Sequence, residues 1–130
     1  MPATDKFASF APVVLRAALV VLFLWFGLSQ LTNPSGWVSW IPAWALTLGI
    51  PDTTIVLLNG AFETILGAAL LAGYFTRIAA LLLSLHLFFI AYEIGYNDIG
   101  VRDFALALST LALAMMEPDQ LTLDKRMKRE

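Results

Sequence analysis

Four apolar stretches, separated by short polar or proline-containing segments, dominate the hydropathy pattern of this chain. They cover residues 10–31, 54–75, 78–96 and 99–116. An α-helix rises about 1.5 Å per residue, so about 20 residues cross the hydrocarbon core of a bilayer. The pattern therefore predicts an all-α integral membrane protein: one transmembrane domain, an antiparallel four-helix bundle, followed by a tail over residues 117–130.

The last stretch needs its two charged residues in order to reach the length of a full span. Residues 104–116 are uncharged, and Arg102 and Asp103 precede them. Either these two side chains enter the membrane or the helix lies at a thinned edge of the bilayer. We expect the first, because a charge pair buried in a bundle is tolerated where a lone charge is not.

The segment between the first two spans is rich in tryptophan. It contains Trp37, Trp40 and Trp44 and has no charge before Asp52. Tryptophan favours the headgroup level of a bilayer, where its ring is in an apolar environment and its N–H is hydrated. We expect this segment to lie along the membrane interface.

Composition supports the membrane class and excludes several others. The chain is 59% hydrophobic and 14% charged, and its net charge of −2 gives no electrostatic footprint for nucleic acid. It has no cysteine, which rules out thiolate metal sites, disulfides and dithiol chemistry within this chain. With His86 as the single histidine, we expect no metal site.

The distribution of basic residues predicts the orientation. In a four-span topology one side carries six of them and the other side carries only Arg102. The six are Lys6, Arg77, Lys125, Arg126, Lys128 and Arg129. Because cytoplasmic loops are enriched in lysine and arginine, we expect a multi-pass protein of the plasma membrane with both termini in the cytoplasm.

Glu63 is the polar residue that most needs an explanation, since a carboxylate inside a membrane span is costly and normally has a partner. Arg102 is the cation nearest to it in predicted depth, and Arg16 is the second choice, although Arg16 can also reach the headgroups. Glu63 is then either one half of a structural pair or a functional group.

Other polar side chains in the spans leave the same alternatives open. His86 is either a neutral hydrogen-bonding group between helices or a group that transfers a proton or contacts a quinone carbonyl. It shares a helix face with Glu93, because the two are seven residues apart. Arg102 and Asp103 either pair with each other to cap the last helix or belong to a site.

Several motifs, in the right order over nearly the whole chain, resemble the DoxX family. They are Arg16 with Leu24-Trp25-Phe26-Gly27-Leu28-Ser29-Gln30-Leu31 and Asn33-Pro34; Glu63 with Gly67, Gly73 and Thr76-Arg77; and Val101-Arg102-Asp103-Phe104-Ala105. The tail Leu121-Thr122-Leu123-Asp124 is similar to the closing Ser-Leu-Asp element of that family. Two features depart from the family pattern: Gln30 stands where a basic residue is common, and Glu117-Pro118-Asp119-Gln120 replaces a glycine-rich turn.

The resemblance implies a four-helix membrane protein, which in some branches is a subunit of thiosulfate:quinone oxidoreductase and in others joins an oxidative-stress complex. On this basis we expect a quinone-interacting subunit without a covalent cofactor. The candidate catalytic residues are Glu63, His86 and Arg102, and the candidate binding residues are Gln30, Phe89, Glu93 and Asp103. The chain is expected to work with other membrane subunits or with its own copies.

The alternative is a non-enzymatic scaffold or assembly factor with a structural Glu63–Arg102 pair. A row of small residues on the second span, Gly60, Thr64, Ala68 and Ala72, offers a face on which another membrane helix can pack closely. A third function, an ion or proton-coupled carrier, requires an oligomer to complete a polar pathway.

Overall fold

The computed structural model describes residues 3–127, and all its regular elements are helices. In chain order these are α1 (Ala3–Ser9), α2 (Ala11–Thr32), the 3-10 helices η1 (Pro34–Trp40) and η2 (Ala45–Leu48), α3 (Asp52–Ala72), α4 (Thr76–Ile94), α5 (Asp98–Met115) and α6 (Leu123–Arg126). Lys128 and Arg129, two of the basic residues in the predicted tail, lie outside the described part of the chain.

Three helical segments are long and apolar enough to cross a membrane: Asp5–Thr32, Asp52–Ala72 and Thr76–Ile94. Helix α5 carries three charged residues near its start, among them Arg102 and Asp103, and it completes the set of four long helices. The predicted all-α membrane architecture is confirmed, with helix ends that differ from the predicted spans by one to three residues.

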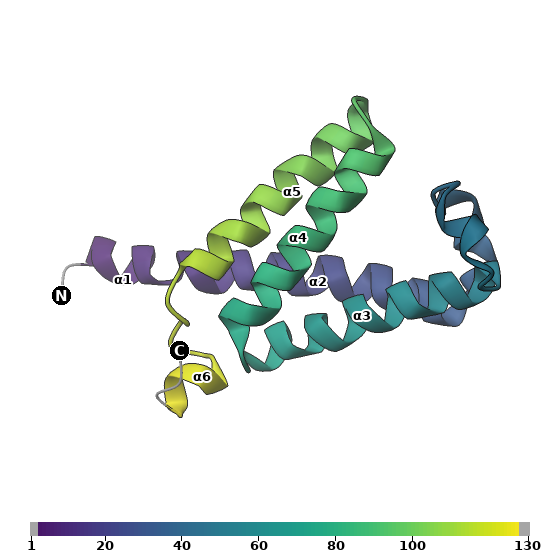
Figure 1. The fold of residues 1–130 in the computed structure, drawn as a ribbon. Helices are drawn as coiled ribbons and strands as arrows, with labels where there is room; N and C mark the ends of the chain where they lie inside the picture. The colour runs from purple at the N-terminus through teal and green to yellow at the C-terminus, as the bar shows by residue number, and fades with distance from the viewer. Residues whose placement is uncertain (1–2, 128–130) are drawn as a thin grey trace.

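The four long helices form two tightly packed pairs, α2 with α3 and α4 with α5. The contacts between the pairs are fewer and come mainly from α3 against α4 and α2 against α5. Figure 1 shows the two pairs crossing at an angle, with the α3–α4 turn and α6 at one end and the α4–α5 turn at the other. Any group that joins α3 to α4 therefore also joins the two pairs.

Apolar side chains from all four long helices fill the space between the pairs. The largest contributions come from Leu19, Phe23, Leu70, Leu83, Leu87, Ala107 and Leu113. Most of the remaining apolar side chains point outward: Val21, Ile65 and Leu71, for example, are each at least 60% exposed. Such a surface suits lipid, because lipid tails are as apolar as the side chains that face them.

Helices α2 and α3 approach each other at glycines. A Cβ atom on Gly27 would lie 2.8 Å from the backbone nitrogen of Thr64 and 3.0 Å from the carbonyl oxygen of Gly60. Gly60 and Thr64 are thus occupied by a contact inside the chain, whereas Ala68 and Ala72 are exposed. This corrects the prediction that the whole row of small residues is a free docking face.

The tryptophan-rich segment folds back on the helices. Helix η1 packs against α2 and α3, and the ring of Trp37 lies 5.6 Å from that of Phe26. Farther along, Trp44 makes an edge contact with Phe89 of α4, at 5.9 Å between ring centroids. The segment therefore contacts both helix pairs at the end opposite the α3–α4 turn.

We expect Gly27→Ala to destabilise the protein. Alanine is the better helix former by about 1 kcal/mol, but its Cβ meets backbone atoms of α3 that cannot rotate away. Overpacking of this kind costs about 1–3 kcal/mol, so the net free energy of unfolding should fall. SDS titration of the protein in mixed micelles, followed by circular dichroism, measures it.

Gly67→Ala is the matched control. A Cβ there would lie 3.1 Å from Cδ2 of Leu24, at the flexible end of a side chain that can shift. This variant should be at least as stable as the parent protein, because the gain in helix propensity is opposed only by a contact that can relax. Equal stabilities for the two variants would contradict the close backbone approach at Gly27.

Candidate functional site

Glu63 lies at the centre of a polar cluster between the two helix pairs. It is 4% exposed, and its Oε1 accepts a hydrogen bond of 2.7 Å from Nε2 of Gln30 on α2. Its Oε2 lies 3.1 Å from Nε2 of His86 on α4. Both carboxylate oxygens are therefore engaged by groups from two other helices. We call Gln30, Asn59, Glu63 and His86 the Glu63 cluster.

The Gln30 amide links two residues of α3. Its Nε2 donates to Glu63 and, at 3.1 Å, to the carbonyl of Phe26, while its Oε1 accepts a bond of 2.7 Å from Nδ2 of Asn59. Gly60 makes this possible, since a Cβ there would lie 2.9 Å from Cβ of Gln30. The glycine lets the amide sit directly over α3, between Asn59 and Glu63.

His86 connects this cluster to the second helix pair. Its Nε2 faces the carboxylate, and its ring packs at 4.8 Å against Phe62, the neighbour of Glu63 in sequence. The side chain is 18% exposed. Within the described chain Nδ1 has no hydrogen-bond partner, so the second ring nitrogen is available to another group. A neutral imidazole with its proton on Nε2 donates to Glu63, and a protonated one forms an ion pair with it.

Aromatic rings lie near the cluster on α3, on α4 and in the tryptophan-rich segment. Phe89 follows His86 by about one turn of α4, is 47% exposed and contacts Trp44, the residue just before η2. Phe62 covers the ring of His86 from α3. Phe62 therefore packs against the imidazole, and the contact between Phe89 and Trp44 lies about one turn farther along α4.

The predicted Glu63–Arg102 pair is wrong. Arg102 is exposed, and no ion pair or hydrogen bond among the described residues joins it to Glu63. The reason is helix rotation: α5 buries Gly100 and Ala107 against its neighbours, and Arg102 is roughly 200° round the helix from Gly100. Two residues at equal depth meet only if both also face inward.

The other predicted site residues divide between the cluster and the surface. Asp103 is half-buried, and no hydrogen bond or ion pair among residues 3–127 joins it to Glu63. Glu93 is exposed, and the structure does not connect it to the Glu63 cluster within residues 3–127. Of the seven candidates, the structure therefore joins Gln30, Glu63 and His86 directly.

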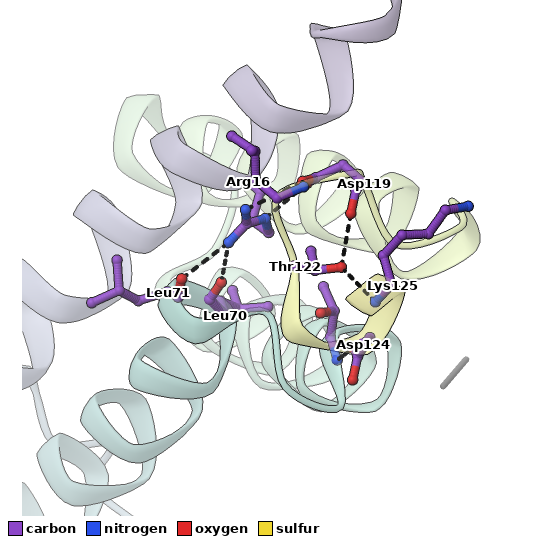
Figure 2. A network of polar contacts seen from close by, with 9 residues as sticks. Arg16, Leu70, Leu71, Asp119, Thr122, Asp124 and Lys125 are labelled. Atoms are coloured by element: carbon purple, nitrogen blue, oxygen red, sulfur yellow. Dashed lines mark hydrogen bonds and ion pairs between the residues drawn. The ribbon is translucent and has the colours of Figure 1, made fainter. Parts of the chain in front are cut away.

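A second polar cluster was not predicted, and it occupies the opposite end of the bundle. Nε and Nη2 of Arg16 donate to the two carboxylate oxygens of Asp119, at 2.8 and 3.3 Å. Nη1 donates to the carbonyls of Leu70 and Leu71 at 2.7 and 3.1 Å, in the last turn of α3 (Figure 2). Arg16 therefore neither pairs with Glu63 nor extends to the headgroups.

Asp124 completes this second cluster by capping α4. Its Oδ1 and Oδ2 accept bonds of 2.8 and 2.7 Å from the backbone N–H groups of Phe75 and Thr76. Phe75 has a left-handed backbone (φ 51°), which is costly for a side chain of this size. The buried carboxylate stabilises that turn by satisfying two donors at a helix N-terminus. We call Arg16, Asp119, Thr122 and Asp124 the Arg16 cluster.

Sequence reasoning read the tail as a basic topogenic segment and so missed its two buried aspartates. Asp119 and Asp124 are 7% and 1% exposed, respectively, and Thr122 between them is fully buried. The signal that could have found them was present: an isolated arginine in the first span and acidic residues in the last segment. Taken alone, neither the arginine nor the acidic residues indicate that Arg16 and Asp119 form a pair.

Comparison with known proteins gives a family. The sequence pattern of the DoxX family matches residues 11–94, which is more than half of the 130 residues. The matched range contains Arg16, Gln30, Glu63 and His86 and ends before α5. No curated protein and no solved structure shows significant similarity to this chain.

We expect Asp124→Ala to weaken the attachment of the tail to the helices. The substitution leaves the N–H groups of Phe75 and Thr76 without their acceptor, and hydrogen bonds to a charged group contribute about 1.5–3 kcal/mol each. The thermal midpoint of the purified protein in detergent should fall by several degrees. Limited proteolysis should release residues after 117 faster.

Glu117→Ala is the control, because Glu117 is exposed and precedes the same segment. It should leave both the midpoint and the proteolysis rate unchanged. If Asp124→Ala behaves like Glu117→Ala, the cap does not hold the tail.

Proposed function

The chain belongs to the DoxX family, and we propose that it is a quinone-interacting subunit of a membrane oxidoreductase, with the Glu63 cluster as its quinone site. One observation carries the proposal: a histidine between two helix pairs has one nitrogen on a buried carboxylate, and the other has no partner among residues 3–127. Ionisable groups inside membrane spans mark proton or substrate pathways more often than they serve packing alone.

The chemistry of the cluster suits a quinone. A quinone needs an apolar slot for its ring and tail, a donor for a carbonyl oxygen and a route for protons. Phe62, Phe89 and Trp44 offer flat apolar surfaces near His86. The ring nitrogen Nδ1 of His86 is the donor when the imidazole is protonated.

In this proposal the residues of the chain hold and move one proton. Glu63 keeps Nε2 of His86 protonated and orients the ring, and Gln30 fixes the carboxylate from the other side. Nδ1–H then donates to a carbonyl oxygen and can pass its proton there as the quinone is reduced. The second proton comes from water at the membrane surface.

The electrons come from a partner. The chain has no cysteine and a single histidine, so it lacks the ligand sets of iron–sulfur clusters and of a haem with two histidines. We therefore propose that another subunit of the complex supplies electrons to the quinone. Asp103, which is half-buried, is proposed to act at the edge of the site, whereas Arg102 and Glu93 are exposed and are proposed to act only outside it.

We also propose that both termini are cytoplasmic. Lys6 on α1, Arg77 at the start of α4, and Lys125 and Arg126 on α6 belong to the end of the molecule that holds the α3–α4 turn and α6 (Figure 1). Arg102 lies near the α4–α5 turn at the opposite end. The positive-inside rule favours the end with four described basic residues as cytoplasmic.

We expect His86→Ala to weaken quinone binding about threefold to tenfold, the effect of losing one hydrogen bond. A short-tailed quinone titrated into the purified protein in nanodiscs should quench tryptophan fluorescence and saturate. Trp44→Phe should remove most of the quenching, because Trp44 contacts Phe89 beside the site. Glu63→Gln should weaken binding as well, since it removes the charge that holds the imidazole.

Ser84→Ala is the matched control on the same helix. Ser84 is buried, and among residues 3–127 its hydroxyl donates only to the carbonyl of Leu81, so its loss changes packing without touching the cluster. It should bind quinone as the parent protein does. Quenching that does not saturate, or equal affinities for His86→Ala and Ser84→Ala, would contradict the proposal and favour the scaffold alternative.

A further inference from the structure

A surface pocket lies between α4 and α5, towards the end of the bundle that holds the α3–α4 turn. Its volume is about 430 Å³, and it is lined by Arg77, Ile78, Leu81, Leu111, Ala114 and Met115. Ile78, Leu81 and Met115 are 57%, 43% and 72% exposed, so its walls continue into the lipid-facing surface. The lining combines one guanidinium with five apolar side chains.

Arg77 is held at the pocket by one of its nitrogens. Its Nε donates a bond of 3.1 Å to the carbonyl of Ala114, which lies in the last turn of α5 and has no helical partner of its own. Within the described chain the two terminal nitrogens have no hydrogen-bond partner. A guanidinium fixed by Nε presents these two donors as a fork that matches the oxygens of a phosphate.

The surrounding charge is positive at this end. Asp124 bonds the backbone of Phe75 and Thr76, so the residues that follow it, Lys125 and Arg126, are fixed beside the start of α4. Of the acidic residues nearby in sequence, Asp119 is paired with Arg16 and Asp124 with backbone donors. Among residues 117–127, Glu117 is the exposed carboxylate that remains.

We propose that this pocket binds an anionic phospholipid, with its phosphate on the terminal nitrogens of Arg77 and one acyl chain along Ile78, Leu81, Leu111 and Met115. A phospholipid has both a phosphate for Arg77 and an acyl chain for the apolar walls of the pocket. A free phosphate would contact only Arg77 and would gain nothing from the five apolar side chains. Basic pockets between membrane helices near the cytoplasmic side are a known means of holding acidic headgroups.

Native mass spectrometry of the purified protein tests this site with two lipids of identical acyl chains, phosphatidylglycerol and phosphatidylcholine. We expect phosphatidylglycerol to bind at least fivefold more tightly than phosphatidylcholine. Arg77→Gln should weaken the binding of phosphatidylglycerol about fivefold, which is the effect of one basic residue near an acidic headgroup. Lys6→Gln, which removes a basic residue from α1 instead, should bind as the parent protein does. Glycerol 3-phosphate should not compete.

A second pair of variants tests whether an acyl chain occupies the apolar part of the pocket. This pair tests the lipid site even if Arg77→Gln does not fold. Leu81→Trp fills the pocket, whereas Leu82→Trp places the same ring on the neighbouring residue, which is equally exposed and outside the lining. Only Leu81→Trp should lose phosphatidylglycerol. Equal binding by these two variants, equal affinity for the two lipids, or competition by glycerol 3-phosphate would overturn the proposal.

Discussion

A carboxylate inside a membrane bundle must be solvated by protein groups, and Glu63 imposes this requirement on three helices at once. Gln30 from α2 and His86 from α4 engage its two oxygens, so the group on α3 joins both helix pairs. The glycines follow from the same constraint, because Gln30 reaches Glu63 and Asn59 only where Gly60 lets α2 and α3 approach closely. The polar contacts and the close packing of α2 with α3 are thus parts of one arrangement.

The Arg16 cluster differs from the Glu63 cluster in how completely its polar groups are hydrogen-bonded, which distinguishes a structural cluster from a candidate binding site. The charged groups there are well paired. Arg16 donates hydrogen bonds to Asp119 and to carbonyls at the end of α3, and Asp124 accepts hydrogen bonds from backbone N–H groups at the start of α4. In the Glu63 cluster, Nδ1 of His86 has no partner within the described chain. A saturated network fixes a structure, whereas one with an available nitrogen beside aromatic rings can accept a ligand.

Hydropathy predicted the four long helices, because the length of an apolar run is set by the thickness of the bilayer. It did not predict the partners of Glu63. Depth alone suggested Arg102, but the rotation of α5 turns that residue outward, and rotation depends on packing that no single helix reveals. The buried tail was missed for a related reason: Asp119 and Asp124 contact residues more than 45 positions away in sequence.

Photoaffinity labelling tests the central claim, that the Glu63 cluster binds a quinone, most directly. A photoreactive quinone analogue, crosslinked to the protein in bilayers and located by peptide mapping, should label α4 near Phe89 and the segment that contains Trp44. The labelling should decrease in His86→Ala and persist in Ser84→Ala. Label spread evenly over the lipid-facing side chains, and equal in the two variants, would contradict the account.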